Sequence, residues 1–331
     1  MTAIIELRGL TKRYGDLTAV DDLDLTIEAG GVFGFIGPNG AGKTTTMRIM
    51  TTLLRPTSGE AYIAGHSVID EPQAVRRAIG YMPDFFGVYE DMMVWEYLDF
   101  FAACYDIPAA TRPGMIDDLL ALVDLGPTRD AYVENLSRGM KQRLCLARTL
   151  THDPQVLILD EPASGLDPRA RIEMRELLRE LQKMGKTIFF SSHILSEVAD
   201  ICTSIGVIEN GRLVASGNVE EMMSRLRAHR LITARFVPGA AVDMDEVTAW
   251  LRAQPGVLSV AAGDGNPLPD VIQLDFGGDD VGMSDLLAGL ISRGLPVVSF
   301  SEERGDLEDV FLHVTRGLAD GSPVDENQPG P

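Results

Sequence analysis

Apolar and polar residues alternate in short runs along residues 3–36, and glycines separate these runs. Alternation with a period of two is typical of strands that are buried on one face, so this part predicts a β-rich lobe. The run GVFGFI continues the pattern and leads into a segment rich in glycine. Beyond that segment the apolar spacing changes to that of a helix, which we expect from Thr44 to Leu54.

The pattern becomes helical over a long middle stretch, from Glu71 to about Arg138. The segments WEYLDFFAACY and PGMIDDLLALVDL carry apolar residues three and four positions apart. This spacing places the apolar residues on one face of an amphipathic helix. We interpret residues 86–138 as an α-helical subdomain inserted into a larger domain, residues 1–220.

Strands and helices alternate again over residues 137–208. The apolar runs VLILD, TIFFSSH and SIGVIE have the length of strands, and a helical segment separates the first two. Such alternation predicts an α/β fold, with a parallel sheet that helices cover on both faces. Asn210-Gly211, between two further apolar runs, predicts a two-residue β-hairpin.

A second unit is expected at residues 228–317, with a different order of elements. Its patterns follow one another as strand, helix, strand, strand, helix, strand, which is the ferredoxin-like βαββαβ order. Residues 231–305 carry no histidine or cysteine cluster and no acid–base pair at a catalytic spacing. A structural or dimer-supporting role is therefore expected, and a regulatory small-molecule site is the alternative. The polar residues 318–331, rich in proline and glycine, are predicted to be disordered.

Composition and charge exclude several classes of function. Hydrophobic residues make up 45% and charged residues 24%, a balance typical of a folded soluble protein. No run approaches the about 20 apolar residues that a membrane helix needs, and the N-terminus lacks a signal pattern. We expect a cytoplasmic protein that reaches a membrane only through a partner. The net charge of −20 argues against nucleic-acid binding, which needs a basic surface.

The segment GPNGAGKTT matches the P-loop pattern GxxxxGK[ST] between a predicted strand and a predicted helix. Its glycines let backbone N–H groups surround phosphate oxygens, and the helix directs its positive end at the same phosphates. Lys43 would reach the β- and γ-phosphates of ATP, and the Thr44 hydroxyl would ligate Mg²⁺. The predicted ATP-binding residues of this loop are Gly37, Pro38, Asn39, Gly40, Ala41, Gly42, Lys43, Thr44 and Thr45.

Two adjacent carboxylates follow the apolar strand VLIL. Asp160 and Glu161 thereby stand at the carboxyl end of a strand, where open α/β sheets bind their ligands. Asp160 suits the aspartate that organises Mg²⁺ beside a P-loop. Glu161 could accept a proton from the water that attacks the γ-phosphate. We therefore predict Asp160 as a metal ligand and Glu161 as the catalytic base.

A further motif, LSRGMKQRL at Leu136–Leu144, precedes this strand. With it the chain resembles the ABC transporter ATPase family, whose signature is usually LSGGQ. Arg138 and Met140 depart from that signature, whereas Ser137 and Gly139 are retained. The resemblance implies that the Ser137 hydroxyl and the backbone at Gly139 bind the γ-phosphate of an ATP molecule held by the P-loop of the other subunit.

Other elements of the family follow in the expected order. The segment SGLD, ending at Asp167, resembles the D-loop, which crosses the dimer interface and places Asp167 near the opposite nucleotide. His193 resembles the switch histidine that contacts the γ-phosphate, and with Lys43 and Glu161 it completes the implied catalytic set. Tyr14 resembles the aromatic residue that stacks on adenine, and core packing is the alternative for this side chain.

The resemblance covers residues 3–217 and implies an ABC-type nucleotide-binding domain that uses ATP and Mg²⁺. It also implies two kinds of partner. One is a second ATPase subunit, in a head-to-tail homodimer or in a heterodimer with a related ATPase. The other is a separate transmembrane permease, which would hold the chain on the inner face of the cell membrane. DLEDVFLHVT at 306–315 is similar to the end of drug-resistance exporter ATPases of the daunorubicin-resistance type, which favours export without indicating the cargo.

Asp84 stands where the family carries the glutamine of its Q-loop, just after YxP. A carboxylate binds a metal more strongly than an amide does, so one hypothesis is that Asp84 is a Mg²⁺ or water ligand in the closed state. The alternative is that Asp84 points away from the metal and only shapes the loop that couples to the permease. The aromatic residues Phe85, Phe86 and Tyr89 either belong to the core of the helical subdomain or form an exposed groove for a permease.

Two other functions are compatible with the same motifs. One is an ABC ATPase without a permease, serving DNA repair, translation or cluster assembly. The acidic charge, the single nucleotide-binding domain and the lack of a long coiled-coil insertion argue against it. The other is a regulatory subunit that does not hydrolyse ATP. The presence of Glu161 and His193, both implied to be catalytic, argues against it. We predict the hydrolysing subunit of an ABC exporter.

Overall fold

The structure is a computed structural model that describes residues 3–85, 87–194, 198, 201–219, 230–240, 242–261 and 270–303. It divides into two compact units, Met1–Val219 and Glu220–Pro331. No helix within these described ranges is long and apolar enough to cross a membrane.

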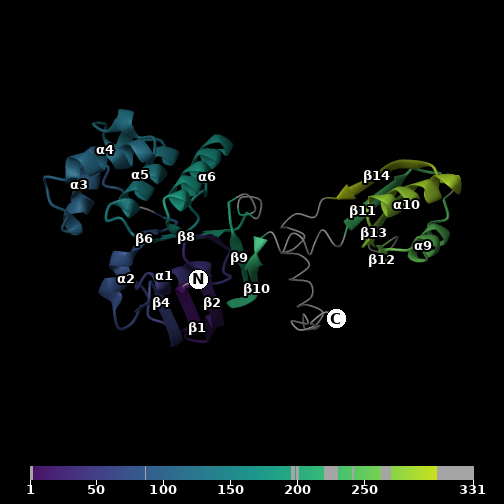
Figure 1. Ribbon diagram of the computed structural model, residues 1–331, viewed down its shortest axis with the longest axis horizontal. Coiled ribbons are helices and arrows are strands. Elements are labelled where there is room, and N and C mark those ends of the chain that lie inside the picture. The colour runs from purple at the N-terminus through teal and green to yellow at the C-terminus, as the bar shows by residue number, and fades with distance from the viewer. Residues whose placement is uncertain are drawn as a thin grey trace. The chain divides into compact units, whose positions relative to one another are not determined.

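A six-stranded sheet forms the centre of the first unit, in the order β10-β9-β3-β8-β7-β6 (Figure 1). All neighbours in it are parallel except β9 and β10, which pair antiparallel across the predicted Asn210-Gly211 turn. Every residue of β3, β7 and β8 is buried, as expected of strands that are covered on both faces. The strand bounds are β3 Val32–Ile36, β6 Ile79–Met82, β7 Val156–Leu159, β8 Thr187–Ser192, β9 Ser204–Glu209 and β10 Arg212–Asn218.

Helix α6 (Pro168–Lys183) shows how local sequence sets an element of this layer. Asp167 caps it, because its Oδ1 accepts a hydrogen bond from the N–H of Ala170 at 2.9 Å, and proline occupies the first turn. Its buried side chains recur at helical spacing and lie on one face: Met174, Leu177, Leu178 and Leu181. The helix therefore covers the sheet with an apolar face and leaves its charged face to solvent.

The β-rich lobe is a second, antiparallel sheet in the order β2-β1-β4-β5. Its strands are β1 Ala3–Tyr14, β2 Leu17–Glu28, β4 Ser58–Ile63 and β5 His66–Ser67. Side chains of this lobe share one core with α1 (Lys43–Met50) and the central sheet, including Ile5, Leu25, Phe35, Met47 and Ile158. The shared core places the turn between β1 and β2 close to the start of α1, where the P-loop ends.

Helices α3 (Val94–Cys104), α4 (Arg112–Leu122) and α5 (Arg138–Leu150) pack together as a helical group within the first unit (Figure 1). Two 3-10 turns, η1 Gly126–Thr128 and η2 Val133–Asn135, connect α4 to α5. The helical pattern expected from Glu71 to about Arg138 misses one strand. After α2 (Pro72–Ala78) the chain forms β6, an edge strand of the central sheet that pairs with β7.

The second unit has its own sheet and its own core. Its elements are β11 Arg230–Phe236, α9 Met244–Arg252, β12 Val257–Ala261, β13 Val271–Phe276, α10 Asp280–Ser292 and β14 Val297–Glu303. The sheet order is β12-β13-β11-β14, antiparallel at every pairing. Ile232, Phe236, Leu274 and Phe276 pack against Leu251 and Leu290 of the two helices. The element order is the one expected from the sequence.

The predicted boundaries of the helical subdomain and of the C-terminal domain stay predictions. The segment at 306–315, the tail at 318–331 and Phe86 lie outside the described residues.

Candidate nucleotide-binding site

The P-loop connects β3 to α1, the strand and helix that the pattern predicts around it. Gly40 and Gly42 have φ angles of 82° and 110°, which disfavour any residue with a Cβ. A Cβ at Gly42 would also lie 2.5 Å from the carbonyl oxygen of Ala19 in β2. Gly42 is the cap residue of α1, so the loop delivers its backbone directly to a helix N-terminus.

Lys43 is held inside the loop by backbone carbonyl groups. Its Nζ donates to the oxygens of Gly37 at 2.7 Å and Pro38 at 3.2 Å, and the residue is only 6% exposed. Burial lowers the pKa of Lys43, while the negative charges of Glu161 and Asp160 act in the opposite direction. Gly37 and Pro38 thus orient the lysine through their carbonyl groups.

Asp160 follows β7 and is almost fully buried, with 1% of its surface exposed. Its Oδ1 accepts a hydrogen bond from the hydroxyl of Ser191 in β8 at 2.7 Å. Its buried Oδ2 has no hydrogen-bond partner in the part of the chain that the structure describes. A buried carboxylate oxygen without a donor suits a cation ligand, because burial without a partner is otherwise costly.

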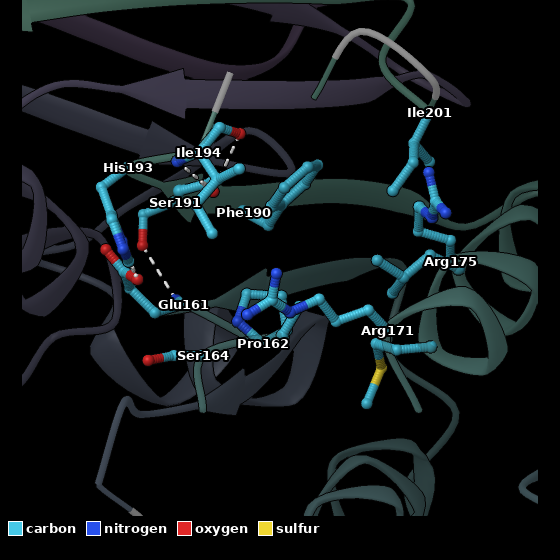
Figure 2. Close-up of a pocket in the computed structure, with 14 residues that line it drawn as sticks. Glu161, Pro162, Ser164, Arg171, Arg175, Phe190, Ser191, His193, Ile194 and Ile201 are labelled. Atoms are coloured by element: carbon cyan, nitrogen blue, oxygen red, sulfur yellow. Dashed lines mark hydrogen bonds and ion pairs between the residues drawn. The ribbon is translucent and has the colours of Figure 1, made fainter. Parts of the chain in front are cut away.

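Glu161 contacts two of the other predicted site residues. Its Oε2 accepts a hydrogen bond from Nδ1 of His193 at 2.6 Å, and its Oε1 lies 3.9 Å from Nζ of Lys43. A carboxylate can only accept, so this bond places the proton of His193 on Nδ1. Figure 2 shows His193 and Ser191 pointing toward Glu161 from β8 and the loop that follows it. The three residues predicted to be catalytic are therefore in mutual contact through Glu161.

A cleft of about 480 Å³ lies over the P-loop. Its volume falls within the range of small-molecule sites. The P-loop half is lined by Asn39, Gly40, Ala41, Gly42, Lys43, Thr44 and Thr45, and the rest by Tyr14, Leu17, Ala19, Asp84, Glu161, Ser164 and His193. Tyr14 is 47% exposed at this cleft, so core packing does not explain it.

A separate groove of about 300 Å³ contains the other predicted ligand residues, Ser137, Gly139 and Asp167. Ser137 caps α5, and its Oγ accepts from the N–H of Met140 at 3.3 Å. Arg138 donates to the carbonyl oxygen of Ser164 at 3.3 Å. The groove contains a helix N-terminus and the arginines at 138, 143 and 169, features that favour an anion.

Comparison with known proteins identifies the family. Residues 20–164 match the family model described as ABC transporter. The chain is 35% identical over 325 residues to the daunorubicin/doxorubicin resistance ATP-binding protein DrrA of Streptomyces peucetius, covering 98% of this chain and 96% of the relative. It is 33% identical over 316 residues to the Nod factor export ATP-binding protein I of Ralstonia nicotianae, covering 95% and 94%. The chain belongs to the ABC transporter ATP-binding proteins.

Solved structures agree with this assignment. The structure of CbiO1 from Clostridium perfringens, part of the ABC transporter complex CbiONQ, has a TM-score of 0.62 at 28% identity and covers 68% of this chain and 92% of its own. A solved ATP-binding subunit of another ABC transporter has a TM-score of 0.61 at 29% identity, covering 68% and 93%. The family and the nucleotide-binding domain fold predicted from the motifs are confirmed, whereas the ferredoxin-like class of the second unit stays a prediction.

The chain is thus the ATP-binding subunit of an ABC transporter, in a family that hydrolyses ATP to power transport. In this ABC ATPase, Asp84 is exposed and lines the cleft over the P-loop, as the ligand hypothesis requires. The described residues contain no group of three or more His, Cys, Asp or Glu side chains that could hold a metal by themselves. Mg²⁺ at a P-loop needs few protein ligands, because phosphate and water oxygens supply the others. Thr44 and Asp160 fit that need, and the role of Asp84 stays a prediction.

The aromatic stretch after Asp84 divides between core and surface. Tyr97 is fully buried in α3, whereas Phe85 is 88% exposed and Tyr89 is 54% exposed. Tyr89 also contacts the rings of Tyr97 and Phe100, with ring centroids 6.4 and 5.6 Å apart. Tyr97 thus belongs to the core and Phe85 is on the surface, while a groove for a permease stays a prediction.

Four residues at the site were not predicted from the sequence. Leu17 and Ala19 line the cleft from β2, and Ser164 lines it after β7. Leu17 could have been predicted, because it follows Tyr14 closely in the sequence. Ser191 bridges Asp160 and Glu161, and a serine inside an apolar strand carries no motif of its own.

Proposed function

We propose that the cleft over the P-loop binds ATP with Mg²⁺. The backbone of Gly40–Thr45 surrounds the phosphates, Lys43 contacts the β- and γ-phosphates, and Tyr14 stacks on adenine. Thr44 and the free oxygen Oδ2 of Asp160 hold the metal, which when bound neutralises charge on the phosphate oxygens. The volume of the cleft and its lining by Lys43, Thr44 and Glu161 support this assignment.

Glu161 acts as the general base in this proposal. Its carboxylate accepts the proton of the water that attacks the γ-phosphate, and His193 holds that carboxylate in place by the 2.6 Å hydrogen bond. Lys43 supplies positive charge where negative charge develops. The observation that carries the proposal is that one carboxylate, 14% exposed, contacts both His193 and Lys43.

Each ATP molecule is bound by two chains. The groove with Ser137, Gly139 and Asp167 supplies the second half of the site to the nucleotide in the cleft of the other copy, in a head-to-tail homodimer. The helix N-terminus and the arginines of the groove support binding of the γ-phosphate there. ATP binding would close the dimer, and hydrolysis would open it.

The dimer drives a separate permease from the inner face of the membrane, in the direction of export. The names of two relatives that match almost the whole chain, a drug-resistance protein and an export protein, support this direction. Exposed Phe85 and Tyr89 offer adaptable apolar surface for a permease segment. Co-purification of a multi-span membrane protein with this chain from detergent extract, and its loss in a Phe85→Asp variant, would test this part.

Replacing Glu161 by Gln tests the catalytic assignment. The amide keeps the size of the side chain but cannot accept the proton, so we expect hydrolysis to fall by about 100- to 10,000-fold. Binding of a fluorescent ATP analogue should remain within a few-fold of wild type. The control is Glu173→Gln, which changes a carboxylate that lines the groove and not the cleft. This variant should retain ATP binding in the cleft. Normal steady-state hydrolysis by Glu161→Gln would refute the assignment.

A further inference from the structure

Ser191 is the only side chain in the described part of the chain that hydrogen-bonds both to Asp160 and to the backbone of Glu161. It is fully buried in β8, and its Oγ lies 2.7 Å from Oδ1 of Asp160 and 2.9 Å from the backbone nitrogen of Glu161. Figure 2 shows Ser191 directed at Glu161 from the neighbouring strand. β7 and β8 pair in parallel with Leu159 opposite Phe190, which brings Ser191 level with the carboxylates.

The two bonds use the hydroxyl in two different ways. The O–H donates to the carboxylate of Asp160, and a lone pair of the same oxygen accepts the N–H of Glu161. Only a group that donates and accepts at once can make both bonds. The bond to Oδ1 fixes the rotation of the Asp160 carboxylate and leaves Oδ2 without a protein partner among the described residues. Oδ2 is the oxygen we assign to Mg²⁺.

The backbone of Glu161 is in a conformation that needs support. Its φ angle is 52°, in the left-handed region that residues with a Cβ seldom adopt. The bond from its N–H to Ser191 stabilises this conformation at the end of β7. This conformation directs the Glu161 side chain to His193 and Lys43. Support for the backbone of Glu161 is therefore also support for the position of its carboxylate.

We propose that Ser191 is a positioning residue that aligns the metal-binding oxygen of Asp160 and the catalytic carboxylate of Glu161 at the same time. This inference rests on the roles proposed above for those two residues. Ser191 itself lines no part of the ATP cleft. It acts on Mg²⁺ through Asp160 and on the attacking water through Glu161, so its loss affects both metal binding and turnover.

Ser191→Ala and Ser191→Cys test the proposal. Alanine removes the hydroxyl, and cysteine keeps the shape with a weak donor and acceptor. Residues that orient metal ligands typically contribute about 10- to 100-fold to metal affinity or activity, so we expect the half-saturating Mg²⁺ concentration for binding a non-hydrolysable fluorescent ATP analogue to rise about 10-fold. We also expect kcat to fall by about 10- to 100-fold. Binding of the analogue without Mg²⁺, and KM for ATP at saturating Mg²⁺, should stay near wild type.

Thr149→Val is the matched control. Thr149 is also buried, and its Oγ1 donates to the carbonyl oxygen of Leu146 at 2.7 Å within α5, away from the site. The loss of this hydroxyl should change neither the Mg²⁺ requirement nor kcat. Thermal unfolding of all variants shows whether any loss of activity comes from loss of fold.

Two outcomes would overturn the proposal. One is a wild-type Mg²⁺ requirement and kcat in both Ser191 variants. The other is an equal loss of analogue binding with and without Mg²⁺, which indicates general damage to the cleft. Glu161→Gln is measured in parallel. If that variant is inactive while the Ser191 variants are normal, only the inference about Ser191 fails, and if Glu161→Gln is active, the proposed catalytic role itself fails.

Discussion

The cleft over the P-loop and the groove that contains Ser137, Gly139 and Asp167 lie in the same unit but differ in how complete they are. In the cleft, Lys43, Glu161 and His193 already contact one another, and Asp160 is fixed by Ser191. In the groove, Ser137 and Gly139 lie at the start of α5 beside Asp167 and several arginines, and Arg138 donates to the carbonyl oxygen of Ser164, a residue that lines the cleft. The two surfaces share no lining residue.

This difference indicates what each surface does. A cleft whose reactive groups are connected in advance can bind nucleotide and orient the reacting groups by itself. A groove that presents a helix N-terminus and arginines can bind an anion brought to it, but it does not contain Lys43, Glu161 or His193. This difference supports the proposal that the two surfaces complete each other between copies of the chain.

Adding negative charge to the groove should separate the two surfaces most strongly. A Cβ at Gly139 would lie 3.5 Å from Ala170 and 3.6 Å from Leu166, which are ordinary contacts, so an added Cβ is tolerated there. Gly139→Asp places a carboxylate where the γ-phosphate of the other copy would bind. Like-charge contacts of this kind cost about 3 kcal/mol, so we expect hydrolysis to fall by about 100-fold. ATP-analogue binding to the cleft should persist.

Gly139→Ala is the control for this substitution. It adds the same Cβ without charge and should keep most of the activity. An acidic residue in the first turn favours the helix, so Gly139→Asp should fold normally. Loss of ATP-analogue binding in Gly139→Asp, to the extent seen when Lys43 is changed to Ala, would contradict the division into two surfaces.

Asp84→Ala sharpens the comparison on the side of the cleft, with a smaller expected effect. Asp84 is exposed, and exposed charges contribute up to about 1 kcal/mol, so we expect the half-saturating Mg²⁺ concentration for hydrolysis to rise about two- to five-fold. Asp84→Gln should be intermediate, because an amide oxygen is a weaker ligand. If Asp84→Ala leaves the Mg²⁺ dependence unchanged, Asp84 is not a ligand.

His152 provides a test of stability that involves neither surface. Its ring stacks on Tyr105 with centroids 3.8 Å apart, and its Nε2 lies 2.8 Å from the carbonyl oxygen of Ile79 in β6. Burial lowers the pKa of His152, and the positive charge of Lys186 lowers it further. The hydrogen bond to Ile79 and the negative charge of Asp153 act in the opposite direction. Below about pH 6.5 the unfolded chain therefore takes up a proton that the folded chain does not. The free energy of unfolding consequently decreases as the pH is lowered.

The replacement His152→Gln should remove this contribution. Its free energy of unfolding should change less than that of wild type between about pH 7.5 and about pH 5.5 in denaturant titrations. Its ATP hydrolysis at about pH 7.5 should match wild type, because His152 lines neither the cleft nor the groove. An equal pH dependence in the two proteins would show that another group is responsible.

Much of the fold follows from the sequence because its strands are strongly patterned. β3, β7 and β8 are short apolar runs, and turn residues mark the hairpin between β9 and β10. β6 was missed because it has only four residues and follows a helical segment directly. A Cβ at Gly80 in this strand would collide with the carbonyl oxygen of Thr149 in α5, a tertiary constraint that no local pattern contains.

The candidate site divides in the same way. Lys43, Asp160 and His193 belong to motifs whose spacing carries their chemistry, so the sequence predicts them. Ser191 lies in β8 of the central sheet and Ala19 in β2 of the other sheet, so only strand pairing and sheet packing bring them to the site. Contacts between segments far apart in the chain are what the sequence alone could not supply.

Mixing two inactive variants tests the shared site most directly. The Glu161→Gln variant lacks the base of its own cleft but has an intact groove. The Gly139→Asp variant has an intact cleft but an altered groove. In a head-to-tail pair of the two, one of the two ATP sites contains no substitution. Variants mixed before ATP is added should therefore recover about a quarter of the wild-type rate, since half of random pairs are mixed. If both variants fold and bind the ATP analogue but the mixture hydrolyses ATP no faster than either variant alone, the groove of one chain does not complete the cleft of another.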